Sequence, residues 1–191
     1  MGSEAVSGDT EARSSNQEWF AFRVRPRHEK SVALALRQRG CSEFLPLMRE
    51  KRKWANRLRY VDMPMFPGYV FSLVSRTSLL TVLSTPGVMD VVRAGSTPIA
   101  ASRDEMEALR LAVLSEVPME RCSSYIGVGN TVQIIEGPLI GLKGILVNVR
   151  KSQRLVLSVS LLCRSVLIEI DNDWVAPNAA PSHEAEFGIS F

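Results

Sequence analysis

The apolar positions in the first half of the chain switch between strand and helix spacing. Residues 19–24 (WFAFRV) are aromatic and apolar and predict a strand. Val32, Ala35 and Leu36 lie on one side of a predicted helix over 27–39, and Gly40 follows where a helix would end. Further strands are predicted over 43–49, 69–74 and 88–93, and a short helix over 78–84.

A longer helix is predicted to begin after residue 102. Ser102 and Glu105 have the spacing of a capping box, in which the serine accepts a hydrogen bond from the glutamate N–H and the glutamate reaches back. Met106, Leu109 and Val113 then follow at helical spacing. The resulting order, strand–helix–strand–strand–helix–strand–helix, predicts an antiparallel sheet with helices packed on it.

After this helix the pattern changes to short β-rich runs separated by turn residues. Four such runs within roughly 50 residues predict a small barrel. They lie at 131–135, 144–149, 154–161 and 166–170. We therefore expect an α+β protein with one domain over 18–116, a linker over 117–127 and a barrel over 128–176. Residues 1–17 are expected to form a disordered tail, because they offer little to bury, and residues 177–191 a loose tail.

Charge is distributed unevenly between the two predicted domains. Residues 19–115 hold 16 basic and 8 acidic side chains, whereas residues 116–191 hold 6 and 8. The basic half is therefore suited to nucleic acid or to an acidic protein surface. The chain has no run of 18 apolar residues and only three scattered cysteines, so we expect no membrane span and a cytoplasmic location.

The sequence gives no support to an enzyme. Its only histidines are His28 and His183, and it has neither a nucleophile motif nor a ligand-spaced cluster of Cys and His. The segment GPLIGLKG lacks the GxxxxGK[ST] pattern of a phosphate loop, so Gly137, Gly141 and Gly144 are interpreted as structural. We expect no catalytic residues, no cofactor and no metal site.

Two segments, in this order, resemble one protein family. MFPGYVF (65–71), after the opening WFAFRVRP (19–26), resembles the NGN domain of NusG/RfaH-type transcription elongation factors. GNTVQIIEGPLIGLKGILVNVR (129–150) is similar to the KOW motif of that family, and 154–171 resembles the rest of its C-terminal barrel. The resemblance implies an NGN α/β domain joined to an SH3-like β-barrel (KOW), acting as a monomer.

The resemblance also implies a docking surface for the clamp helices of RNA polymerase. Tyr69 and Phe71 alternate along one strand and therefore share a face. The residues that match the family surface are Ala21, Phe66, Pro67, Tyr69 and Phe71. Aromatic side chains provide large apolar areas for such a contact. The alternative is that these rings form the core of the domain.

Two basic clusters are candidates for DNA contact near the transcription bubble. One comprises Arg23, Arg25, Arg27 and Lys30; the other comprises Lys51, Arg52, Lys53, Trp54, Arg57 and Arg59. Phosphate contact needs charge more than precise geometry, and an aromatic ring can stack on a base. A solvated hairpin is the alternative for the second cluster.

The barrel is expected to recruit a partner, which the resemblance identifies as NusE, and with it the ribosome, or Rho. The matching positions are Leu139, Leu142, Leu161, Leu162 and Arg164, with barrel core as the alternative. The basic insertion before FPGY favours a specialised antiterminator of the UpxY or RfaH kind over a general NusG. A ribosome-associated RNA-binding KOW protein is the other alternative. Strand-forming residues favour a stable barrel, although the leucine-rich stretch 155–162 leaves a helical form open.

Overall fold

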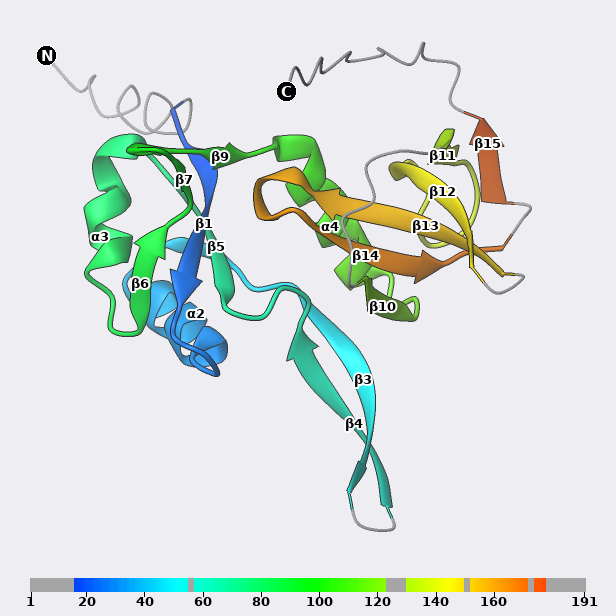
Figure 1. Ribbon diagram of the computed structural model, residues 1–191, viewed down its shortest axis with the longest axis horizontal. Helices are drawn as coiled ribbons and strands as arrows, with labels where there is room; N and C mark the ends of the chain where they lie inside the picture. Colours follow the sequence, from blue (N-terminus) through cyan, green and yellow to red (C-terminus); the bar gives the residue numbers. More distant parts are fainter. Residues whose placement is uncertain (1–15, 55–56, 123–129, 150–151, 172–173, 178–191) are drawn as a thin grey trace, which may run out of the picture.

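The computed structural model describes residues 16–54, 57–122, 130–149, 152–171 and 174–177. These residues form two antiparallel sheets, a projecting hairpin and a few helices (Figure 1). The α+β class and the antiparallel sheets predicted from the sequence are confirmed. The predicted tails at 1–17 and 177–191 lie almost wholly outside the described residues. No described helix is long and apolar enough to cross a bilayer.

The N-terminal sheet has the strand order β2-β5-β1-β6, with β9 also paired to β1. Its strands are β1 (Glu18–Val24), β2 (Ser42–Phe44), β5 (Tyr69–Val74), β6 (Val88–Val91) and β9 (Ala100–Ala101). The helical segments of this half are α2 (Glu29–Gln38), η1 (Arg76–Ser78), α3 (Leu79–Leu83) and α4 (Arg103–Leu114), and a small ribbon joins β7 (Arg93–Ala94) to β8 (Thr97–Pro98).

The strand β1 is apolar on both faces because both faces are covered. Phe20, Phe22 and Val24 pack with α2 and α3 in one core. Trp19 and Ala21 point to the opposite face, where they join the apolar side of α4 and residues of the second sheet. The continuous apolar run at 19–24 is thus the pattern of a central strand buried on both sides.

The predicted strand over 43–49 divides into two elements at Pro46. β2 ends at Phe44, and β3 (Leu47–Trp54) leaves the sheet to pair with β4 (Arg57–Pro64) as a two-stranded hairpin. Proline has no N–H to donate, so the backbone at Pro46 cannot donate to a strand ladder. The Met65 N–H donates to the Pro46 carbonyl at 2.9 Å and closes the base of the hairpin.

The C-terminal sheet has the strand order β10-β14-β13-β12-β11-β15. Its elements are β10 (Met119–Cys122), β11 (Asn130–Ile134), β12 (Lys143–Val149), β13 (Ser152–Val159), η2 (Ser160–Leu162), β14 (Arg164–Glu169) and β15 (Val175–Pro177). The four strands predicted from the sequence are all present. The predicted linker over 117–127 is wrong at 119–122, because β10 pairs with β14; residues 123–127 lie outside the described part.

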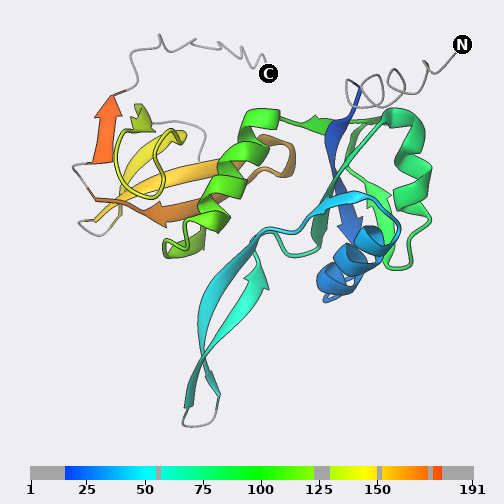
Figure 2. The same cartoon turned by 180° about the vertical axis from the view of Figure 1, so that it is seen from behind.

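Helix α4 lies between the two sheets and contacts β1 and β13 (Figures 1 and 2). Its buried residues, Met106, Leu109 and Ala112, belong to one apolar cluster that continues from the face of β1 and β5 into the C-terminal sheet. We call this cluster the shared core. It includes Phe66 and Phe71 from the N-terminal half and Leu155 and Val159 from β13. The two domains are therefore held together by apolar packing.

The glycines of the C-terminal sheet have the structural role that the sequence predicted. Gly137 has a φ of +81°, and a Cβ there would lie 2.7 Å from the Trp174 ring. At Gly144 a Cβ would lie 2.8 Å from the Val156 carbonyl oxygen and 2.9 Å from Leu155. The backbones of β12 and β13 can approach this closely only because residue 144 has no side chain.

We expect Gly144→Ala to destabilise the C-terminal sheet by about 1–3 kcal/mol, because the added methyl group meets backbone that cannot move aside. Hydrogen exchange of β12 and β13 measures the change. The matched control is Lys143→Ala, an exposed neighbour for which a change within about 0.5 kcal/mol is expected. Equal protection in the two variants would contradict the close approach at Gly144.

Candidate functional site

The residues of the predicted docking surface lie together on the β1–β5 face of the N-terminal sheet. Ala21 is paired with Phe71, and both are fully buried. The ring of Phe66 meets the ring of Phe71 edge to face at 6.1 Å, and only 2% of Phe66 is exposed. Tyr69 is half-buried and Pro67 is exposed. The sequence thus located a real cluster, most of which is covered in this conformation.

Arg164, at the start of β14, lies directly on this cluster. Its Nη1 donates a hydrogen bond to the Pro67 carbonyl at 3.1 Å. Its guanidinium lies 5.1 Å from the centre of the Tyr69 ring, within the range of a cation–π contact. Arg164, predicted to bind the partner of the barrel, therefore contacts Pro67 and Tyr69, which are predicted to bind polymerase.

Two of the predicted barrel leucines also face the N-terminal domain. Leu161 and Leu162, in η2, are half-buried against the shared core. Leu139 and Leu142 are 0% and 1% exposed and belong to that core, so they offer no surface to a partner here. The docking role of these five positions remains a prediction.

Helix α4 contributes a polar contact through Glu105, a residue that the sequence predicted to cap its own helix. Glu105 Oε1 accepts hydrogen bonds from the Ser160 N–H at 3.1 Å and from the Ser160 hydroxyl at 2.7 Å. Ser102 makes no side-chain capping bond, so the predicted capping box is wrong. Glu105 turns away from its own helix because the η2 turn provides two donors close to it.

A third contact joins the C-terminal sheet to the base of the hairpin. Arg121, on β10, donates to the Glu50 carboxylate at 3.0 Å and to the Pro64 carbonyl at 3.1 Å. Glu50 and Pro64 belong to β3 and β4. The C-terminal sheet is therefore fixed to the N-terminal half at three points, through Arg164, Glu105 and Arg121.

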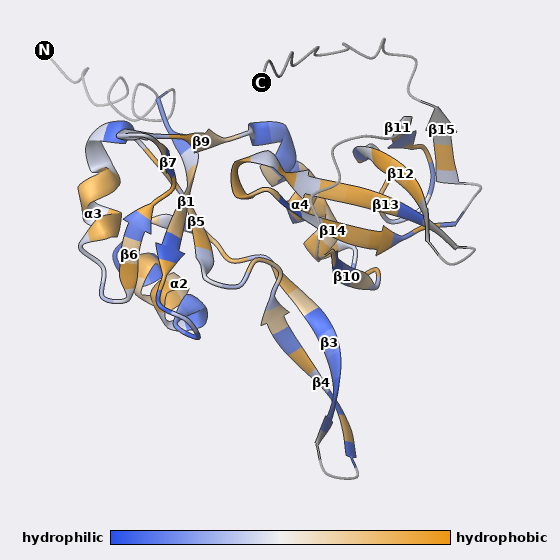
Figure 3. Ribbon diagram, viewed as in Figure 1, coloured by the Kyte–Doolittle hydropathy of each residue, from blue (hydrophilic) through white to orange (hydrophobic). Residues whose placement is uncertain are grey.

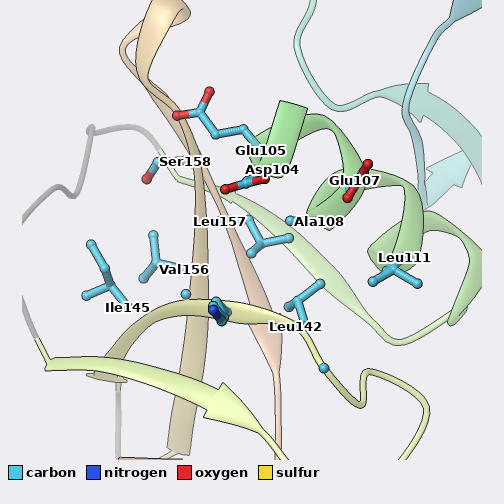
Figure 4. A pocket seen from close by; sticks show the side chains of 13 residues that line it. Asp104, Glu105, Glu107, Ala108, Leu111, Leu142, Ile145, Val156, Leu157 and Ser158 are labelled. Atoms are coloured by element: carbon cyan, nitrogen blue, oxygen red, sulfur yellow. The ribbon is translucent and has the colours of Figure 1, made fainter. Parts of the chain in front are cut away.

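A groove of about 420 Å³ runs between α4 and the C-terminal sheet (Figure 4). Asp104, Glu105 and Glu107 line its helix side, and Leu142, Val156 and Leu157 line its sheet side. The groove combines carboxylates with aliphatic side chains and contains no histidine, cysteine or serine–histidine pair among its lining residues. It marks the edge of the contact between α4 and the C-terminal sheet.

The two predicted basic clusters lie on different elements. Arg23 and Arg25 lie at the end of β1, Arg27 in the turn that follows it and Lys30 on α2, and all four are exposed. Arg23 is opposite Asp90 in the strand register. The Arg93 side chain, which is hydrogen-bonded to Asp90, lowers the pKa of that carboxyl, and Arg23 adds to the effect. Part of the charge of this cluster is therefore already balanced.

The second cluster forms the projecting hairpin. Lys51, Arg52, Lys53, Arg57 and Arg59 are all exposed. The backbone of Trp54 pairs with Arg57, whereas its side chain lies outside the described part, so its predicted stacking role stays a prediction. The sequence offered two interpretations of this segment, a DNA contact and a solvated hairpin. The structure contains a hairpin with exposed cations, and DNA contact remains a prediction.

The fold and the site define a class of protein: an α+β protein with two antiparallel sheets, an apolar face between them and a basic hairpin beside it. Residues 17–110 match the family model of the transcription termination factor NusG. The chain belongs to the NusG family of transcription factors.

A solved structure of NusG supports the fold. NusG of Thermotoga maritima aligns at 22% identity and a TM-score of 0.50, covering 86% of this chain and 98% of its own. The MjSpt4:Spt5 complex aligns at 16% identity and a TM-score of 0.29, with 84% and 97% covered. A comparison with curated protein sequences gave no match.

We expect the double substitution Glu105→Ala/Arg164→Ala to raise the fraction of molecules in which the two halves are apart, because it removes the polar contacts at two of the three points and leaves the apolar packing in place. Small-angle X-ray scattering of the full chain would then give a larger radius of gyration than for the wild type. The matched control is Asp90→Ala/Arg93→Ala, which removes one acid and one base that pair within the N-terminal half. An unchanged radius in the test variant would show that apolar packing alone holds the domains together.

Proposed function

We propose that the chain binds bacterial RNA polymerase and acts as a transcription elongation or antitermination factor. The contact surface is the β1–β5 face around Phe66, Pro67 and Tyr69, and its partner is the helical clamp of the polymerase. Membership of the NusG family supports this proposal. The observation that carries it is the apolar face with aromatic side chains, which is covered by helix α4 and the C-terminal sheet.

An apolar face of this kind suits the apolar side of a partner helix. Phe66 and Tyr69 provide large ring areas, and Ala21 lies opposite Phe71 in the strand register. In the closed conformation the C-terminal sheet occupies the position that the polymerase helices would need. Docking therefore requires the C-terminal sheet to move away, and the polymerase replaces it as the cover of the shared core.

The C-terminal sheet has a corresponding role in the proposal. We propose that its strands over 128–176 belong to an SH3-like barrel that recruits a second partner, NusE with the ribosome or Rho. Leu161, Leu162 and Arg164 are the contact residues, because they lie at the domain boundary and become accessible on release. Leu139 and Leu142 support this surface from the core. A single opening step then exposes both binding surfaces.

The basic clusters add contact to DNA near the transcription bubble. The exposed cations of the hairpin and of the turn after β1 are suited to phosphate by charge. A specialised antiterminator of the UpxY or RfaH kind is favoured over a general NusG by the length and charge of the hairpin. Its six Lys and Arg residues over 47–64 face only two carboxylates.

The test is binding of the full chain to purified core RNA polymerase. Glu105→Ala/Arg164→Ala removes contacts worth about 2 kcal/mol in total, estimated from hydrogen-bond and cation–π energies. If the closed form dominates, the apparent Kd falls by up to about 30-fold, because more of the protein is binding-competent. Asp90→Ala/Arg93→Ala is again the control and leaves the Kd unchanged.

A third substitution separates docking from opening. Tyr69→Ala, added to the opened variant, removes a half-buried ring of the docking face and weakens binding at least tenfold, as expected for an interface anchor. Leu80→Ala removes an exposed apolar side chain far from this face and serves as its control. Tight binding that survives Tyr69→Ala would place the polymerase contact elsewhere.

A further inference from the structure

The β3–β4 hairpin is attached to the molecule only at its base. β3 and β4 pair with each other and with no other strand (Figures 1 and 2). Near the base, Met48 is buried and Glu50 is held by Arg121. Beyond this point the described side chains from 51 to 60 are all exposed, including 61% of Leu58 and 68% of Tyr60. Both faces of the outer hairpin are therefore free for contact.

The strand register assigns the cations to the two faces. Residues directly opposite in an antiparallel pair share a face, and neighbours along a strand alternate. Lys51 is opposite Tyr60 and Lys53 is opposite Leu58, so these four side chains lie on one face. Arg52 is opposite Arg59, and Arg57 follows the alternation of Arg59 onto this second face. Each face thus carries at least two cations.

These charges are not balanced within the protein. The Glu50 carboxylate contacts Arg52 at 3.3 Å and Arg121 at 3.0 Å. Within the described part of the chain, Lys51, Lys53, Arg57 and Arg59 form no ion pair. The pair Arg52–Arg59 places like charges directly opposite each other, which destabilises a hairpin by itself. A polyanion lying against both faces would remove this repulsion. Figure 3 shows hydrophilic residues along the outer half of β3.

We propose that the outer β3–β4 hairpin enters the major groove of double-stranded B-form DNA, with one face toward each of the two flanking phosphate backbones. This inference rests on the DNA contact proposed above and specifies its form. Stacked sheets pack about 10 Å apart, so a two-stranded ribbon with the inner part of its side chains occupies a layer of about that thickness. The major groove of B-DNA is about 12 Å wide and admits a two-stranded ribbon. Lys51 and Lys53 meet one backbone, and Arg57 and Arg59 meet the other.

Other nucleic acids fit this arrangement less well. The major groove of A-form RNA is too deep and narrow for side chains to reach. A single strand lying on the hairpin would use the cations of one face and leave the other face without a partner. Duplex DNA is therefore the ligand that uses both faces.

The test is fluorescence anisotropy of the full chain with a labelled 20-bp DNA duplex, one of its single strands and an RNA duplex of the same sequence. The variants are matched pairs two residues apart, Lys51→Ala/Lys53→Ala on β3 and Arg57→Ala/Arg59→Ala on β4. Each pair removes about two phosphate contacts, so each weakens duplex binding roughly 10- to 50-fold and reduces the salt slope by about 2. Arg103→Ala/Lys143→Ala removes two exposed cations away from the hairpin and is the control.

The result expected is tightest binding to the DNA duplex, lost to a similar extent in both hairpin variants and retained in the control. Loss in only one variant, or tighter binding of the single strand or the RNA duplex, would overturn groove insertion while leaving a nucleic-acid role for the hairpin. Unchanged DNA binding in both hairpin variants would overturn groove insertion and also the nucleic-acid role of the hairpin. Core polymerase binding, measured separately without DNA, reports on the docking proposal. Circular dichroism confirms that each variant remains folded.

Discussion

The N-terminal sheet is apolar on both faces, but its own helices α2 and α3 cover only one of them. The other face carries Ala21, Phe66 and Phe71 and needs a cover from elsewhere. Exposing a single large apolar side chain costs about 1.5–3 kcal/mol, so an uncovered face of this kind would destabilise the domain. Helix α4 and the C-terminal sheet provide the cover here, and the arrangement of the two domains follows from that need.

Polar contacts around this apolar face orient the C-terminal sheet on the N-terminal half. Arg164, Glu105 and Arg121 each join the two halves through exposed or partly exposed groups. Such contacts contribute about 1 kcal/mol each, which is small beside the apolar area that they surround. They therefore fix the orientation of the C-terminal sheet without locking it. A partner that offers an equally apolar surface can replace the sheet at modest cost, and this exchange is the basis of the proposed function.

Much of the fold followed from local pattern, whereas the contacts between the domains did not. Spacing and turn residues report on neighbours along the chain, so they predict helix α2 and the four C-terminal strands. The FPGY cluster followed from the resemblance to a family, because the residues alone left a core role open. Glu105 was assigned to a cap, because its true partner Ser160 lies far away in the sequence. Likewise β10 was placed in a linker, since its four residues are recognised as a strand only beside β14. An apolar residue suits both a docking surface and a barrel core, so the sequence could not decide between these roles for Leu139 and Leu142. The three-dimensional structure shows that both are buried.

The most direct test of the central claim, that the C-terminal sheet must leave before polymerase can dock, is to hold the sheet in place. In a chain whose Cys41, Cys122 and Cys163 are replaced by serine, Glu105→Cys and Ser160→Cys can be joined by a short reducible crosslinker, because the two residues are in hydrogen-bond contact. Binding of core RNA polymerase is then measured before and after reduction. We predict that the crosslinked protein does not bind and that reduction restores binding. Equal binding by the crosslinked and reduced forms would contradict the claim.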